Sequence, residues 1–328
     1  MKTTLLLSLL MSALLSGAVA AETDLSPYQP LLERQQYRKL QQQLSAVPDF
    51  ASQPQLQLLH YKSMLSLGED EALEPLLEAQ RKQYPADAEL FYLSAANKFN
   101  LAQAGSLFSA PGRAKAGLAL LQQAIALQPD EIKYQQALVS FYAAAPGIAG
   151  GDIDEANKVA EAIAKKDAVQ GTLAKAKVLQ QDDVKKALQL LKTAIEQQPQ
   201  QAELLQSYAT LLSMDKQHLQ ASSYHQQAAA LFTEPGKQYE SLYQVGRLAA
   251  VEGIEPDKGA QALSRFIEFF RDSDHPSYSW ALLRLAQIQL KSQNKAAAEQ
   301  TIAPLLAKEP AQKTLRNELK TFIKQLKG

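Results

Sequence analysis

The chain has 328 residues, of which 46% are hydrophobic, and its 34 basic and 34 acidic side chains give a formal net charge of zero. This balance excludes the strongly basic surface that nucleic acid or an anionic membrane attracts. Only 14 glycines and 15 prolines are present, too few for a turn-rich all-β protein. The composition therefore favours an all-helical chain.

The first twenty residues, MKTTLLLSLLMSALLSGAVA, have the pattern of an export signal. Lys2 precedes an apolar run from Leu5 to Leu15, and the small residues Ala18–Ala20 end the segment. We therefore expect residues 1–20 to be a signal peptide that is cleaved after Ala20, which would place the mature chain in the bacterial periplasm. The apolar run is too short to favour a stable membrane span. Because the sequence has no cysteine, the chain is not a bacterial lipoprotein, whose lipid is carried by a cysteine.

The remaining residues, 21–328, are predicted to form one domain of about six to seven helical hairpins. Ala187 and Ala221 are 34 residues apart, and so are Ala194 and Ala228. Antiparallel helices pack closely only where small side chains lie at their crossing, and a proline stops the second helix of each unit. The recurring sets are Gly117, Leu121, Ala124 and Pro129; Ala187, Leu191, Ala194 and Pro199; and Ala298, Ile302, Leu305 and Pro310.

With these residues the chain resembles the tetratricopeptide repeat (TPR) family, whose small residue in the first helix has counterparts in Ala209, Gly246 and Ala286. The resemblance implies an all-α, right-handed α-solenoid of stacked antiparallel helical hairpins. Insertions at AGSLFSAPGR, PGIAGG and GIEPDKG depart from the family's spacing. Residues 25–54 are expected to form an N-terminal cap and residues 311–328 a C-terminal capping helix. The approximate repeats are Gln55–Pro85, Ala88–Pro129, Ile132–Lys166, Ala168–Pro199, Ala202–Pro235, Tyr239–Arg271 and Ser279–Pro310.

The glycine-rich stretch PGIAGG raises the question of a phosphate site. A phosphate loop follows a strand and usually precedes a Lys and a Ser or Thr, whereas this stretch follows a helical segment and has neither. Asp152, three residues before Glu155, instead predicts a capping box at the next helix. We expect an enlarged turn; the alternative is a ligand or partner contact, because long turns on rigid scaffolds often carry function. The residues of that alternative are Pro146, Gly147, Gly150 and Gly151.

The titratable residues predict neither catalytic chemistry nor a metal or cofactor site. His218 and His225 are seven residues apart near Asp215, but a metal site needs three or four converging ligands. His225 occupies a bulky packing position, so we expect a core histidine with satisfied hydrogen bonds. The segment Asp272–Pro276 is expected to be a polar turn that caps a helix, and Asp182-Asp183 to satisfy free N–H groups at a helix start.

The resemblance also implies a concave groove lined by the first helices of the repeats. The groove is expected to be polar, mostly uncharged, and without the Lys, Asn and Arg set with which some family members clamp a peptide carboxylate. The inward-facing positions extrapolated from the family are Gln136, Ser140, Gln206, Thr210, Tyr243, Arg247, Trp280 and Gln287.

The predicted function is a noncatalytic scaffold or adaptor of the cell envelope that binds a protein or peptide in its groove. Its partner is unidentified, and nucleic acid is not expected. One alternative is a periplasmic module for a glycan or peptidoglycan strand, in which Tyr243 and Trp280 would stack on sugars. A second alternative is an enzyme, which would require a tight pocket with convergent acids or a metal.

Overall fold

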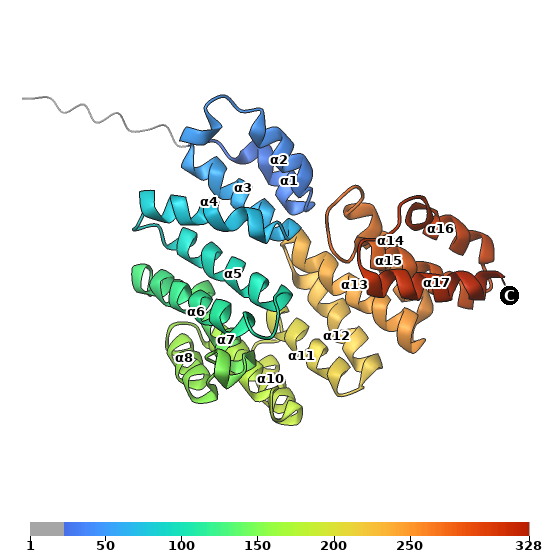
Figure 1. Ribbon diagram of the computed structural model, residues 1–328. Helices are drawn as coiled ribbons and strands as arrows, with labels where there is room; N and C mark the ends of the chain where they lie inside the picture. Colours follow the sequence, from blue (N-terminus) through green and yellow to red (C-terminus); the bar gives the residue numbers. More distant parts are fainter. Residues whose placement is uncertain (1–22, 328) are drawn as a thin grey trace, which may run out of the picture.

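The computed structural model describes residues 23–327, which contain seventeen α-helices, three short 3-10 helices and no strand (Figure 1). The all-α, right-handed α-solenoid of stacked antiparallel hairpins predicted from the sequence is confirmed. The predicted signal peptide, residues 1–20, and its cleavage site after Ala20 lie outside the described residues. None of the helices in the described range is both long enough and apolar enough to cross a membrane.

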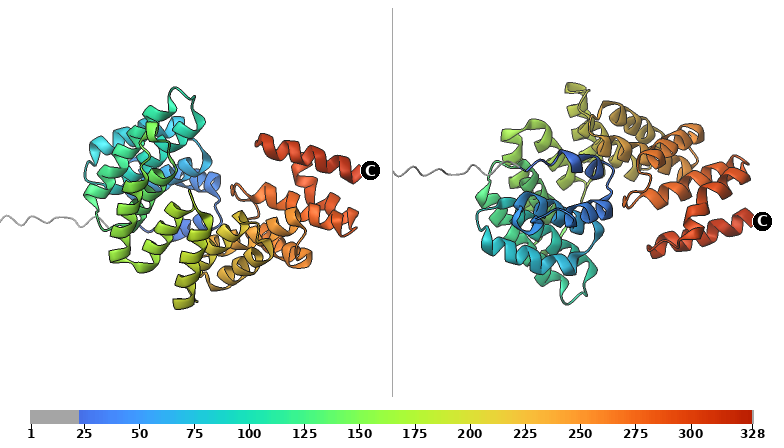
Figure 2. Two further views of the ribbon diagram at one scale, coloured as in Figure 1. Left: turned by 90° about the horizontal axis from the view of Figure 1, so that it is seen from below. Right: turned by 90° about the horizontal axis from the view of Figure 1, so that it is seen from above.

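The chain winds as seven hairpins between two terminal elements, and Figure 2 shows its last helices extending to one side of the coil. The N-terminal element comprises α1 (Gln29–Glu33) and α2 (Tyr37–Ser45), and the C-terminal element is α17 (Lys313–Lys327). The hairpins are α3 (Pro54–Leu67) with α4 (Asp70–Gln83), α5 (Ala88–Ala104) with α6 (Ala110–Leu127), α7 (Ile132–Ala144) with α8 (Ile153–Lys166), α9 (Ala168–Leu179) with α10 (Val184–Gln197), α11 (Ala202–Met214) with α12 (His218–Leu231), α13 (Pro235–Glu252) with α14 (Pro256–Phe269), and α15 (Tyr278–Lys291) with α16 (Lys295–Ala307).

Small residues allow the helices of each hairpin to approach closely. At the crossing of α13 and α14, a Cβ atom on Gly246 would overlap the Leu263 side chain. Ala187 and Ala221, which are 34 residues apart, are both completely buried, as is Leu191 between α10 and its neighbours. The spacing in the sequence therefore marks the positions where side chains leave water and fill the solenoid core.

Acidic caps start several of the helices. The Asp152 carboxylate accepts hydrogen bonds from the backbone N–H groups of Asp154 and Glu155 at 3.0 and 3.1 Å. The capping box predicted there is only half formed, because Glu155 pairs with Lys158. The backbone N–H of Asp152 donates instead to the Tyr142 carbonyl at 3.0 Å, since the PGIAGG turn folds it back onto the end of α7.

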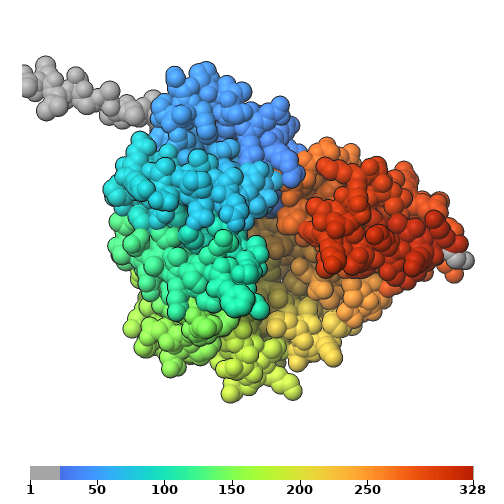
Figure 3. Space-filling model, in the orientation of Figure 1, coloured from blue at the N-terminus to red at the C-terminus, as the bar shows by residue number. Residues whose placement is uncertain are grey.

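The superhelix turns far enough for its N-terminal helices to meet the loop between α14 and α15. The Gln35 carbonyl accepts a hydrogen bond from the Asp274 backbone N–H at 2.8 Å, and the Arg38 side chain forms an ion pair with the Asp274 carboxylate. Arg34 lies over the ring of Phe269, 5.3 Å from its centroid. The space-filling view shows the two segments, coloured blue and orange, in contact (Figure 3). These contacts close the coil into a ring around its inner face.

The last helix covers the end of the core. Leu315, Leu319, Phe322 and Leu326 of α17 are buried in one apolar cluster with residues of α15 and α16. The Arg284 side chain on α15 forms an ion pair with Glu318 on α17. Most of the other side chains of α17 are charged or polar, so the helix separates the solenoid core from water at this end.

Candidate functional site

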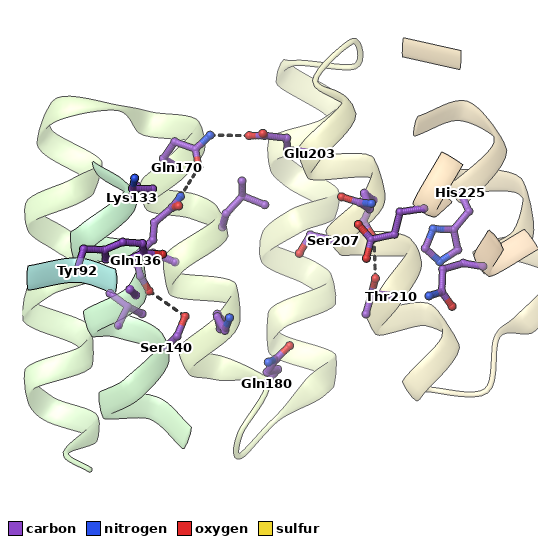
Figure 4. A pocket seen from close by; sticks show the side chains of 18 residues that line it. Tyr92, Lys133, Gln136, Ser140, Gln170, Gln180, Glu203, Ser207, Thr210 and His225 are labelled. Carbon is purple, nitrogen blue, oxygen red and sulfur yellow. Dashed lines mark hydrogen bonds between the residues drawn. The ribbon is translucent and has the colours of Figure 1, made fainter. Parts of the chain in front are cut away.

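A polar cavity of about 660 Å³ lies on the inner face, between the first helices of successive hairpins. Side chains from α5, α7, α9, α11 and α13 line it, and α12 contributes one histidine (Figure 4). Glutamine amides are frequent in the lining, and each amide can both donate and accept hydrogen bonds. The charged lining residues have both signs: Lys133, Lys177, Glu203 and Glu240.

A ladder of hydrogen bonds crosses the hairpins along this face. The Gln136 side-chain amide donates to Gln170, and the Gln170 amide donates to the Glu203 carboxylate (Figure 4). Lys237 then completes the ladder with a 2.8 Å ion pair to Glu203. Successive members are 33 or 34 residues apart because each occupies the same position in its repeat. The ladder holds part of the cavity wall in a fixed arrangement before anything binds.

A second ion-pair bridge joins helices nearer the N-terminus, without the regular spacing of the ladder. Glu89 on α5 pairs with Lys62 on α3 at 2.9 Å and with Lys133 on α7 at 2.8 Å. The two lysines and the Tyr134 hydroxyl, which donates to the same carboxylate, stabilise its charged form against the opposing effect of burial. The pKa of Glu89 is consequently lowered.

Four of the eight groove residues predicted from the sequence line the cavity. Gln136 and Ser140 do so from α7, and Gln206 and Thr210 from α11. The hydroxyls of Ser140 and Thr210 donate to backbone carbonyls one turn earlier in their helices, at 2.8 and 2.9 Å. Their role in binding a partner stays a prediction.

The other four predicted residues lie outside this lining. Tyr243 is 8% exposed and packs against Phe266, with ring centroids 5.3 Å apart. Trp280 is half-buried and donates its indole N–H to Gln312, while Arg284 covers its ring at 5.0 Å. Tyr243 is therefore buried and not open to a groove, and a partner contact of Trp280 stays a prediction. The Arg247 side chain donates a hydrogen bond to the Gln244 side-chain oxygen. The Gln287 amide donates one to the Glu318 carboxylate.

Sequence reasoning missed Glu240 and Gln244, which line the cavity from α13. They lie 34 residues after Gln206 and Thr210, so the repeat period alone would have found them. The sequence prediction counted from the small residue Gly246 instead. It therefore named Tyr243 and Arg247, each three residues after the residue that lines the cavity. Glu240 forms no salt bridge within residues 23–327, and desolvation raises the pKa of its carboxyl group.

His225 lies at the wall of the cavity and is 2% exposed. Burial, and secondarily the charge of Arg247, lowers the pKa of His225 to about 4. Its Nδ1 atom has no hydrogen-bond partner among the described residues. The histidine is therefore a neutral core residue, as expected, but the expectation that its hydrogen bonds are satisfied was wrong.

The remaining sequence candidates have local structural roles. His218 approaches Glu252 at 3.6 Å, and residues 23–327 contain no group of three or more His, Cys, Asp or Glu side chains that could hold a metal. In the Asp272–Pro276 turn, the His275 Nδ1 accepts the Ser277 N–H at 3.0 Å just before α15. The Asp183 carboxylate caps α10 through the Lys186 N–H.

The PGIAGG stretch forms a tight turn between α7 and α8. Gly147–Ala149 make one turn of 3-10 helix, and Gly150 has a φ of 105°, a conformation that favours glycine. A Cβ atom on Gly151 would overlap the Ala145 carbonyl, so the turn needs a glycine there as well. Pro146 lies beside a second cavity, and whether the turn contacts a partner stays a prediction.

No family model and no curated protein sequence matches this chain, whereas solved structures do. The human IFIT1 dimer with PPP-AAAA is similar with a TM-score of 0.51 and 17% identity, over 83% of this chain and 63% of that one. The Cut9–Hcn1 hetero-tetramer of the APC/C has a TM-score of 0.48 and 13% identity, and the match covers 90% of this chain and 54% of that one. The P58(IPK) TPR domain has a TM-score of 0.27 and 17% identity, and the match covers 78% of this chain and 73% of that one. The chain thus spans less than two thirds of the first two structures. The likeness to IFIT1 defines the class of the fold, a TPR-like α-solenoid.

Proposed function

We propose that the protein is a noncatalytic scaffold that binds a protein or peptide segment in the polar cavity of its inner face. The observation that carries this proposal is the preformed wall of amides and paired charges between Gln136 and Lys237. Side chains already held in place lose little conformational entropy on binding. Their donors and acceptors match the backbone N–H and C=O groups of a peptide.

The aromatic residues on which the sugar-binding alternative depends pack against other side chains. Stacking on a sugar requires an open aromatic face, and Tyr243 is buried against Phe266. Trp280 has its ring covered by Arg284. Tyr92 lies in the cavity wall, but its ring packs on Tyr134 with centroids 4.9 Å apart.

The setting that we propose for this scaffold is the bacterial cell envelope. The support is the sequence of residues 1–20, with its basic start, short apolar run and Ala18–Ala20 cleavage motif. The expected result of cell fractionation is recovery of the chain from the periplasm with Ala21 as its first residue. An intact N-terminus and cytoplasmic recovery would overturn the assignment.

Photocrosslinking in cells tests the binding proposal. A photoreactive residue at Thr210 faces the cavity, and Thr193 on the outer helix α10 provides a matched control. Both threonines are exposed, and both donate to a carbonyl four residues earlier in their helices. A discrete protein adduct from position 210 and none from position 193 is expected. Equal adducts from both positions, or none, would contradict the proposal.

A further inference from the structure

A second cavity of about 770 Å³, the apolar cleft, lies between α5, α6 and α7. The stacked rings of Phe99 and Phe141, with centroids 4.9 Å apart, form part of its wall, and alanines form most of the rest. None of its lining residues is charged. A cavity of this size and composition fits the apolar part of a ligand.

Residues of two inserted loops line part of the apolar cleft. One is the α5–α6 connection, residues 105–109, and the other is the PGIAGG turn, residues 146–151. Leu107 and Phe108 are 91% and 99% exposed in the first loop, and Ile148 is 73% exposed in the second. These are the three most exposed large hydrophobic side chains among the described residues. Leu107 and Ile148 line the apolar cleft, and exposed apolar side chains beside an apolar cavity mark an interaction site.

The apolar cleft lies next to the polar cavity and shares lining residues with it. Tyr92, Ala137 and Ser140 line both, so one helix face on α7 separates a polar compartment from an apolar one. A molecule that fills both compartments must have an uncharged apolar part joined directly to a polar part.

We propose that the apolar cleft anchors two or three neighbouring apolar side chains of the same peptide segment whose polar part lies in the polar cavity. The inference rests on the proposed function and adds the chemistry of the partner. A peptide fits better than a single-chain anionic lipid, because the polar cavity presents Glu203 and Glu240 beside its lysines. Leu107 and Ile148, which line the apolar cleft, would lose their exposure to water against the anchored side chains.

Selection from a random peptide library displayed on phage, with the full chain without residues 1–20 as bait, tests this inference. Selected peptides are expected to share a cluster of Leu, Ile or Phe followed or preceded by uncharged polar residues. Each peptide is then synthesised, and its affinity is measured for two pairs of variants. Ala144→Trp fills the apolar cleft from an exposed position, and Ala119→Trp adds the same bulk to an exposed position of α6 outside the lining.

Leu107→Ser removes an apolar side chain from the lining of the apolar cleft. Its control is Leu219→Ser, which changes a 61% exposed leucine of α12. Burying one leucine-sized side chain corresponds to roughly tenfold in affinity. We therefore expect about tenfold weaker binding to the Ala144→Trp and Leu107→Ser variants and unchanged binding to both controls.

The other outcomes separate the two proposals. Peptides that lose affinity only with Thr210→Trp in the polar cavity would overturn the apolar anchor and leave the proposed function standing. A library that yields no peptide would overturn both. Concentration-dependent dimers in sedimentation that disappear with Leu107→Ser would show that a second copy covers the apolar cleft. Specific retention of a single-chain lipid that is abolished by Ala144→Trp would assign the apolar cleft to a lipid. The dimer result and the lipid result would each overturn the proposed peptide anchor.

Discussion

Arg38 and Asp274 form an ion pair across 236 positions of sequence, and this contact joins the first helices of the solenoid to the loop before α15. The Asp274 carboxylate also accepts the Arg38 backbone N–H at 2.9 Å. The Asp274 side chain is 10% exposed and the Arg38 side chain 73% exposed. Because the Arg38 side chain of the pair is exposed to water, the ion pair contributes only on the order of 1 kcal/mol. The backbone hydrogen bonds beside it therefore also stabilise the contact.

Closure of the ring predicts a distance that can be measured. Because the chain has no cysteine, spin labels can be attached specifically at positions 39 and 276, which are exposed on either side of the contact. With no further substitution, one narrow distribution of distances between the two labels is expected. Asp274→Ala should broaden this distribution, since about 1–2 kcal/mol of hydrogen bonding is lost. Glu268→Ala, which removes only the partner of Arg271, should leave it unchanged; broad distributions in all three would refute closure.

The crossing of α13 and α14 predicts an effect of packing on stability. Gly246→Ala should lower the free energy of unfolding by about 1–3 kcal/mol, because the new methyl group would overlap Leu263. Gly236→Ala in the same helix is the control, since a Cβ atom there meets nothing within 4 Å. Urea unfolding followed by circular dichroism measures both. Equal effects of the two substitutions would contradict the packing account.

The buried histidine predicts a pH dependence. His225 has a pKa of about 4 in the folded chain and about 6.5 when unfolded, so the unfolded chain binds a proton that the folded chain excludes. Its effect on stability is absent above pH 6.5 and grows as the pH falls towards 4, reaching about 2 kcal/mol of destabilisation at pH 5. His225→Gln should reduce the difference between unfolding free energies at pH 7 and pH 5 by that amount. An unchanged difference would show that the histidine is protonated in the folded chain.

The PGIAGG turn predicts a difference between its glycines. Gly151→Ala should disturb the turn and weaken any peptide held in the apolar cleft, because the added Cβ would overlap the Ala145 carbonyl. Gly147→Ala should leave the turn and the peptide affinity unchanged, since a Cβ atom there meets nothing within 4 Å. The rate of proteolysis within the turn measures its disturbance, and peptide affinity is measured separately. Similar behaviour of the two variants would mean that the turn does not shape the apolar cleft.

The repeat pattern made the hairpins predictable from sequence. Ala187, Leu191 and Ala221 recur because each fills the same crossing, so their spacing reports local packing directly. Ring closure was not predictable in this way. The approach of Arg38 to Asp274 depends on small rotations that add up over the intervening hairpins.

The candidate site was predictable only in part for a related reason. The period of 34 places Gln136 and Gln170 on one face, but the small residue Gly246 is not in the same register as Ala209, and counting from it pointed to the buried Tyr243. The apolar cleft depends on two loops that are more than thirty residues apart in sequence. Their exposed residues, Leu107 and Ile148, become neighbours of one cavity only in the folded chain.

Calorimetric titration with the partner captured from position 210, or with a selected peptide, tests whether the inner face of the solenoid is the binding site. Thr210→Trp narrows the polar cavity, and Thr193→Trp adds the same side chain to the outer helix α10. At least about tenfold weaker binding to the first variant, with unchanged binding to the second, is the predicted result. Equal affinity for the two variants would show that the inner face is not the binding site.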